Sequence, residues 1–318
     1  MRGKASTAAH IVSSLRTARP PRLCQSRKQQ RVMAGTLLLE NTRDLWSIAS
    51  MAENGTWDAE NDAWEFLVCA ALHHTRASKP NLQAVLTLKT LDVSDEFGRV
   101  TDIEPVRQLS NLRTLVIMSP RVATLDSLVA LKLLEELRLV QNVRVRSLEP
   151  IGHLTTLRRL VLSNSTRFRD IGPLASLDGL VELELGGTRV IDFSPVAALQ
   201  ELTKLGLHGT KIPNLRPLER LTRLEVLDLG QTAICDLEAL AGLTRLKELT
   251  ISRTKVSDLR PLEKLDNLER LEMVGCSKIN SLAALHELPR LMYLSCNIRN
   301  RSELERFRQL HPDCTITK

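Results

Sequence analysis

A motif of the form Leu-x-x-Leu-x-Leu, in which another aliphatic residue can take the last place, recurs ten times in the 318-residue chain. Successive copies lie 22 to 24 residues apart, a spacing more regular than a leucine-rich composition produces by chance. Self-similarity at such a period predicts a chain of stacked structural units. The middle leucines of the ten copies are Leu91, Leu115, Leu137, Leu160, Leu183, Leu205, Leu227, Leu249, Leu271 and Leu294.

The stretch LDLGQTAICDLEAL, residues 227–240, shows what one unit is expected to form. Leu227 and Leu229 alternate with Asp228, so both leucines point to one face of a short strand. Asp236 precedes a turn, and we predict that its side-chain oxygen accepts backbone N–H groups of a short helical or 3₁₀ segment. A catalytic role would require a row of equivalent active sites, because Asp or Asn recurs at this place. These residues are Asp102, Asp170, Asp192, Asn214 and Asp258.

One turn cannot bury its own leucines, but stacked turns share a continuous core with parallel strands about 4.8 Å apart. Ten turns at this spacing give a rod roughly 45 Å long. The stretch LGLHGTKIPNLRPLERL, residues 205–221, and its neighbours resemble the leucine-rich repeat family, in particular its 22-residue, internalin-like bacterial variety. The resemblance covers about residues 82–318.

The resemblance implies an α/β solenoid, a right-handed leucine-rich repeat rod of about ten turns. Its parallel β-sheet would form the concave face, short helices or 3₁₀ turns the convex face, and a small α-helical cap the N-terminal end. It also implies protein–protein recognition on the concave face. Many members carry Asn in the turn after the strand, where this chain usually has Thr, as at Thr210, or Cys276. A hydroxyl offers one donor where an amide offers two, so we expect a weaker ladder between turns.

Four regions are expected along the chain. Residues 1–32 form a basic disordered tail or a start-site extension, residues 33–80 a helical N-terminal cap, residues 81–294 the repeats and residues 295–318 a C-terminal cap. The first region contains eight Lys and Arg residues and no Asp or Glu, which leaves 36 basic against 37 acidic residues elsewhere, a net charge of −1. Since the rest is nearly neutral, nucleic-acid binding is expected only through the tail.

The basic tail has three interpretations that the sequence leaves open. It is a disordered tail or an upstream extension with true initiation at Met33, a mitochondrial presequence if the source is eukaryotic, or a nucleic-acid-binding arm. No apolar region typical of a secretory signal and no run of about 18 apolar residues appear in this sequence, so we expect no membrane span or membrane partner. We expect a cytoplasmic protein, or a mitochondrial one if residues 1–32 are a presequence.

Both ends of a solenoid need covering, because an open end would expose its last layer. Apolar residues at helical spacing predict an N-terminal capping helix: Trp64, Leu67, Val68, Ala71 and Leu72. The ending SELERFRQLHPDCTITK resembles those of bacterial leucine-rich repeat proteins, in which a short helix and a final strand close the core. The predicted plug consists of Leu304, Phe307, Leu310 and Cys314.

The sequence nominates no catalytic residue, cofactor site or metal site. The six cysteines lack paired CxxC spacing, which favours reduced thiols, and Cys276 and Cys296 fall at turn and core positions of the repeat. His73 and His74 have no Cys or carboxylate cluster at ligand spacing. No phosphate-binding loop, GxSxG, HExxH or dinucleotide-binding fingerprint occurs. We therefore expect a protein that is not an enzyme and needs no cofactor.

The outward positions of the strands are the expected interaction surface. One step before the middle leucines, charges alternate in sign between adjacent turns, which favours cross-strand pairing. One and three steps after them lie an apolar cluster near the N-terminal end and, further along, a spaced acidic line. The candidate partner-binding residues are Val116, Met118, Arg138, Val140, Val161, Glu184, His208, Asp228 and Glu272.

An exposed apolar patch commonly marks a partner site, although here the N-terminal cap could instead cover it. We expect a monomeric, non-catalytic scaffold that binds a partner polypeptide on the concave strand face, with basic groups of the partner toward the acidic line. The alternative is a regulatory or effector protein in which residues 1–80 carry delivery or activity and the repeats select the target.

Overall fold

The computed structural model describes residues 87–94, 100–298 and 300–317. The expectations for the basic tail, the start at Met33, the helical cap at residues 33–80 and the His73–His74 pair lie outside the described residues. Among the helices of the described residues, none is long and apolar enough to span a membrane.

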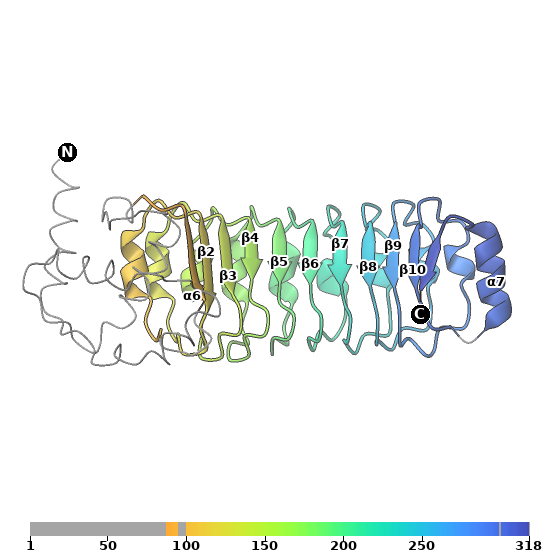
Figure 1. Cartoon of the computed structure of the whole chain (residues 1–318), viewed down its shortest axis with the longest axis horizontal. Coiled ribbons are helices and arrows are strands. Elements are labelled where there is room, and N and C mark those ends of the chain that lie inside the picture. Colours follow the sequence, from red (N-terminus) through yellow and green to blue (C-terminus); the bar gives the residue numbers. More distant parts are fainter. Residues whose placement is uncertain (1–86, 95–99, 299, 318) are drawn as a thin grey trace, which may run out of the picture.

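Parallel strands, stacked in the order of the sequence, form one sheet along a rod (Figure 1). Each middle leucine stands opposite the middle leucine of the next strand, as Leu205 stands opposite Leu227, so the predicted repeat register is confirmed. An eleventh strand, β11, pairs with β10 and supplies the expected final strand. The strands are β1 (Thr90–Ser94), β2 (Thr114–Met118), β3 (Glu136–Leu139), β4 (Arg159–Val161), β5 (Glu182–Glu184), β6 (Lys204–Gly206), β7 (Val226–Asp228), β8 (Glu248–Thr250), β9 (Arg270–Glu272), β10 (Tyr293–Ser295) and β11 (Thr315–Thr317).

Short helical segments, almost all of them 3₁₀, form the side of the rod behind the sheet (Figure 1). One follows each strand from the first turn to the ninth, and leucines from both sides fill the core between them. The segments are η2 (Glu104–Gln108), η3 (Asp126–Ala130), α6 (Glu149–Gly152), η4 (Gly172–Ser176), η5 (Ser194–Ala198), η6 (Arg216–Leu218), η7 (Glu238–Leu240), η8 (Arg260–Leu262) and η9 (Ala283–Leu285).

The predicted capping role of the recurring Asp and Asn is confirmed, with a shift of one position. The Asp236 Oδ1 atom accepts the backbone N–H of Glu238 at 2.8 Å, although the N-cap residue of η7 is Leu237. The side chain therefore closes a turn just before the segment begins, which is the local bonding that Asx side chains favour. The same bond forms at Asp102, Asp170, Asp192, Asn214 and Asp258.

The turn after each strand from β2 to β8 carries a buried polar side chain whose bonding differs along the rod. Asn142 Nδ2 donates to the Ile117 carbonyl of the preceding turn at 3.0 Å, which is the bridging bond typical of an amide. The Thr210 hydroxyl donates instead to the Leu207 carbonyl of its own turn at 2.7 Å. The threonine turns are therefore joined by backbone bonds, such as Gly209 N–H to the Gly230 carbonyl at 2.8 Å.

The helix α7 (Arg301–Leu310) covers the last turn, as the C-terminal expectation requires. Phe307 is fully buried, and Leu304 and Cys314 are partly buried against the core. The prediction for Leu310 is wrong, because that side chain is 51% exposed. The inner face of the helix continues instead to His311, whose ring stacks on Phe307 with centroids 4.5 Å apart.

Candidate interaction surface

The outward face of the sheet, which we call the strand face, carries every candidate binding residue. Along β2 the side chains alternate between partly exposed and buried, so that Val116 and Met118 point outward while Leu115 enters the core. The same alternation places the other candidates outward. Arg138, Val140, Val161, Glu184, Asp228 and Glu272 are partly buried and His208 is exposed.

The predicted apolar cluster spans three neighbouring turns, but a charged residue divides one of its rows. Val116 stands opposite Arg138, which in turn stands opposite Val161. The Arg138 guanidinium is held by Glu136, with 2.6 Å between Nε and Oε1. The second row is continuous, since Met118 and Val140 lie on adjacent turns that are joined by the bond from Val140 N–H to the Ile117 carbonyl. The cluster therefore consists of one continuous apolar row and, beside it, a row in which apolar and charged side chains alternate.

The expected cross-strand charge pairing is present on the first part of the strand face. Arg159 of β4 lies 3.0 Å from the Glu182 carboxylate of β5 and 3.7 Å from the Glu136 carboxylate of β3. At the far end the pairing runs within a strand, since Arg270 reaches Glu272 at 2.5 Å. The Arg270 guanidinium also lies 4.0 Å from the centre of the Tyr293 ring, a cation–π arrangement.

The spaced acidic line is in place, but its carboxylates already have partners. Glu184 lies 3.3 Å from the Lys204 ammonium, and its carboxylate covers Gly206, where an added Cβ would stand 1.6 Å from Oε2. Asp228 Oδ1 accepts the Gly230 N–H at 2.8 Å. With Glu272 paired to Arg270, the line is not a row of uncompensated negative charge, which the sequence could not reveal.

Two of the cysteines have the surroundings of structural residues. Cys276 and Cys296 are buried, as predicted, and burial raises the pKa of the Cys296 thiol. A buried thiol with a raised pKa is a poor nucleophile. In the part of the chain that the structure describes, no three His, Cys, Asp or Glu side chains group as a metal site.

The repeat register, the shared leucine core and the capped turns define a leucine-rich repeat solenoid. The structure is similar to internalin C2 of Listeria monocytogenes, with 29% identity, a TM-score of 0.59 and coverage of 66% of this chain and 92% of that chain. It is also similar to a leucine-rich repeat protein of Leptospira interrogans, with 27% identity, a TM-score of 0.67 and coverage of 74% and 62%.

A third similar structure is the internalin InlF of Listeria monocytogenes, with 21% identity, a TM-score of 0.62 and coverage of 79% of this chain and 87% of that chain. At this identity the likeness shows the fold alone. No protein-family model and no curated protein sequence matches the chain. The neighbours at 29% and 27% identity support the predicted resemblance to internalin-like leucine-rich repeat proteins.

Proposed function

We propose that the protein is a non-catalytic interaction scaffold that binds a partner polypeptide on the strand face. The observation that carries the proposal is the row of outward, partly exposed aliphatic side chains on neighbouring turns, among them Met118 and Val140. Apolar side chains gathered on one face of a soluble domain are typical of a protein-binding surface, whose centre is poorer in charge than its rim.

The paired charges around this row would form the rim of the interface. A basic group of the partner that approaches Glu184 or Glu272 must compete with Lys204 or Arg270 for the carboxylate. Such rim contacts contribute more to orientation and association rate than to affinity. We therefore place the affinity on the apolar cluster, and the selection of the partner on Arg138, His208, Asp228 and the two glutamates.

The experiment compares two valines at the same position of the repeat. Val140 lies in the proposed interface, whereas Val274 occupies the equivalent outward position near the other end of the rod, and both are partly exposed. A photo-crosslinking amino acid at position 140 or 274 first identifies what docks at each place. The purified partner is then titrated against Val140→Glu, Met118→Glu and Val274→Glu in the full chain.

We expect cross-links at position 140, and roughly tenfold weaker binding for each variant in the cluster, because a buried aliphatic side chain contributes about 1.5 kcal/mol. Val274→Glu should bind as the wild type does. Thermal unfolding confirms that the variants are folded. Equal cross-linking at both positions, or unchanged binding by Val140→Glu, contradicts this placement. Deleting residues 1–80 tests the alternative that the preceding segment covers the cluster, since the deletion would then strengthen binding.

A further inference from the structure

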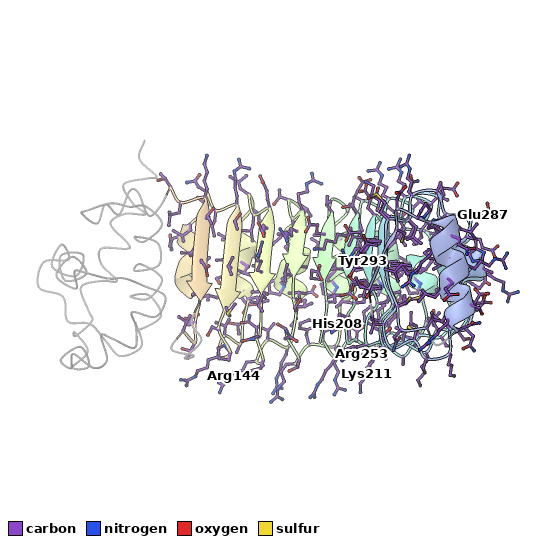
Figure 2. All side chains as sticks on the ribbon, turned by 45° about the vertical axis from the view of Figure 1, so that its right-hand side comes forward. Arg144, His208, Lys211, Arg253, Glu287 and Tyr293 are labelled. Carbon is purple, nitrogen blue, oxygen red and sulfur yellow. The ribbon has the colours of Figure 1, made fainter. Side chains whose placement is uncertain are left out.

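Basic residues line the edge of the rod at which the chain leaves each strand and turns toward the short helices. We call this edge, residues 143–146 and their counterparts in later turns, the turn edge. The residue before the buried apolar side chain of the turn is basic in six of the seven turns from residue 144 to residue 278, and all six are exposed. Figure 2 shows Arg144 and Lys211 at this edge. The six are Arg144, Arg167, Arg189, Lys211, Lys255 and Lys278.

The positive charge is densest where two adjacent turns carry arginines in pairs. Arg144 and Arg146 flank the buried Val145, and Arg167 and Arg169 flank a fully buried phenylalanine of the next turn. Alternation about a buried residue directs both members of each pair to solvent. Since neighbouring turns are about 4.8 Å apart, four guanidinium groups gather on one short stretch of the edge. Arg189 of the following turn extends the group, which we call the arginine cluster.

The arginine cluster lacks the ion pairs that neutralise the strand face. Within the described residues, no salt bridge involves any of its five members. The carboxylates that follow in the same turns, Asp170 and Asp192, accept the backbone N–H groups of Gly172 and Ser194. Like charges held together repel one another, so a bound anionic group would stabilise this stretch.

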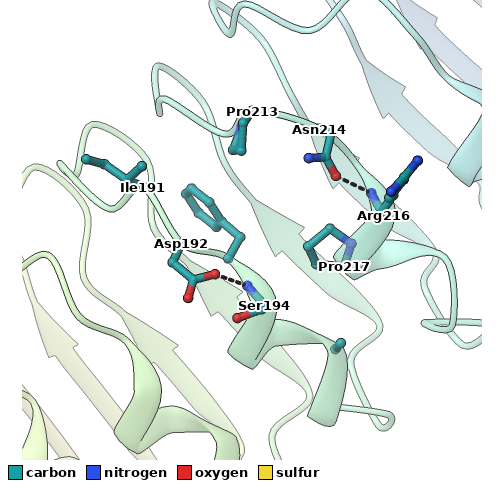
Figure 3. Close-up of a pocket in the computed structure, with 9 residues that line it drawn as sticks. Ile191, Asp192, Ser194, Pro213, Asn214, Arg216 and Pro217 are labelled. Atoms are coloured by element: carbon teal, nitrogen blue, oxygen red, sulfur yellow. Dashed lines mark hydrogen bonds between the residues drawn. The ribbon is translucent and has the colours of Figure 1, made fainter.

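An apolar pocket of about 380 Å³ opens on the same edge, between the turns of η5 and η6 (Figure 3). Ile191 forms one wall and is 57% exposed. It occupies the place in its turn that Arg169 occupies one turn earlier, so the pocket begins where the arginine cluster ends. Pro213 and Pro217 line the other side, beside Arg216.

Two polar side chains in the pocket wall already accept backbone hydrogen bonds. Asp192 Oδ1 accepts the Ser194 N–H at 2.8 Å, and Asn214 Oδ1 accepts the Arg216 N–H at 3.1 Å. Ile191, Pro213 and Pro217 supply an aliphatic surface beside them, which suits an apolar side chain of a ligand.

We propose that the turn edge binds an acidic polypeptide segment, with its carboxylates on the arginine cluster and an apolar side chain in the Ile191 pocket. Guanidinium groups bind carboxylates in a bidentate geometry, which favours arginine at such a site. The cluster and the pocket span four successive turns, about 14 Å, which an extended segment of about five residues covers. This surface is separate from the strand face.

A polypeptide fits these features better than a nucleic acid or a lipid surface does. Proteins that bind single strands stack bases on exposed aromatic side chains, but the aromatic residue in the pocket wall, Phe193, is buried. Charge alone would attract any polyanion, whereas an aliphatic pocket at the end of a basic cluster requires a ligand that carries acidic and apolar groups in sequence.

Fluorescence anisotropy on the full chain tests the proposal with a labelled peptide of four glutamates followed by leucine, and with a peptide in which serine replaces the leucine. Arg146→Glu combined with Arg169→Glu should weaken binding of the leucine peptide roughly tenfold or more. The control, Arg220→Glu combined with Lys264→Glu, makes the same change of charge at exposed residues beyond η6 and η8 and should bind normally.

The pocket is tested by Ile191→Ser, with Met292→Ser as the control at a methionine that is similarly exposed. Only Ile191→Ser should weaken binding, and only for the leucine peptide. An equal loss in both charge variants, or no preference for leucine, overturns the proposal. The proposal is also overturned if phosphatidylserine vesicles or duplex DNA bind more tightly than the leucine peptide and Ile191→Ser does not change that binding. The turn edge would then be a lipid-binding or nucleic-acid-binding surface. Binding by Val140→Glu should be normal, which separates this result from the strand face.

Discussion

Replacement of Phe307 by alanine tests how the C-terminal helix closes the rod. The ring is fully buried, and it stacks on His311 with centroids 4.5 Å apart. A buried phenylalanine truncated to alanine costs about 3–5 kcal/mol, and loss of the aromatic pair adds about 0.5–1.5 kcal/mol. Because each turn of a solenoid contacts only its neighbours, we expect this loss to fall on the last turns, from β9 to β11, rather than evenly along the rod.

Leu310→Ala is the matched control on the same helix. Leu310 is 51% exposed, so its truncation should change the free energy of unfolding by less than about 0.5 kcal/mol. Urea unfolding followed by circular dichroism measures both variants, and hydrogen exchange of peptides from residues 293–317 locates the change. In Phe307→Ala these peptides should lose protection while those from residues 136–206 keep it. Equal destabilisation by the two variants would refute the assignment of the plug, and uniform loss of protection would refute its local character.

Three further predictions concern the turns and the cap. Asp236→Ala should lower the free energy of unfolding by about 1 kcal/mol, because it removes the acceptor of the Glu238 N–H in the turn before η7, and the exposed Glu238→Ala should be nearly neutral in the same urea titration. Gly152→Ala should lower the free energy of unfolding by about 1–3 kcal/mol, because the added Cβ would stand 2.7 Å from a backbone carbonyl oxygen of the next turn. Gly242→Ala is the control, since an added Cβ there meets open space and should cost no stability. Burial lowers the pKa of His286, so the folded state favours the neutral imidazole. The folded protein should therefore lose stability as the pH falls below about 6.5, the ordinary pKa of histidine. In a series of melting temperatures measured at different pH values, His286→Gln should reduce this loss.

The regular part of the fold follows from the sequence because the same local pattern is repeated in every turn. Leu227 and Leu229 alternate with polar residues, and the spacing of 22 to 24 residues leaves little freedom in how adjacent strands align. Asp236 and its counterparts could be assigned to caps because their bonds reach only two residues along the chain. Local chemistry of this kind needs no knowledge of the neighbouring turns.

The details of the strand face could not be predicted, because they depend on which long side chains meet. Lys204 reaches Glu184 rather than Glu182 of the same neighbouring strand, and Arg270 turns back to Glu272 on its own strand. These choices neutralise two of the three carboxylates that the sequence suggested as an acidic line. Rotamers and distances decide such pairs, and the order of residues does not determine them.

The distribution of charge at the turn edge also could not be predicted from the sequence. The net charge of −1 outside residues 1–32 suggested a body without a basic surface. A net charge does not show where the charges lie. Acidic residues of the strand face are paired with basic residues there. Four arginines lie together at one edge: Arg144, Arg146, Arg167 and Arg169. The signal was present in the paired patterns RVR and RFR, 23 residues apart, but it has meaning only once the turns are stacked.

By itself, then, the sequence determined the repeat, the strand register, the leucine core and the capped turns, since period and local bonding specify them. Only the tertiary structure decided that His311 rather than Leu310 extends the buried face of the last helix, that the acidic line is already paired, and that arginines from separate turns meet beside an apolar pocket. The physical reason is distance. Residues about 22 positions apart become neighbours about 4.8 Å apart, and their interactions exist only after stacking.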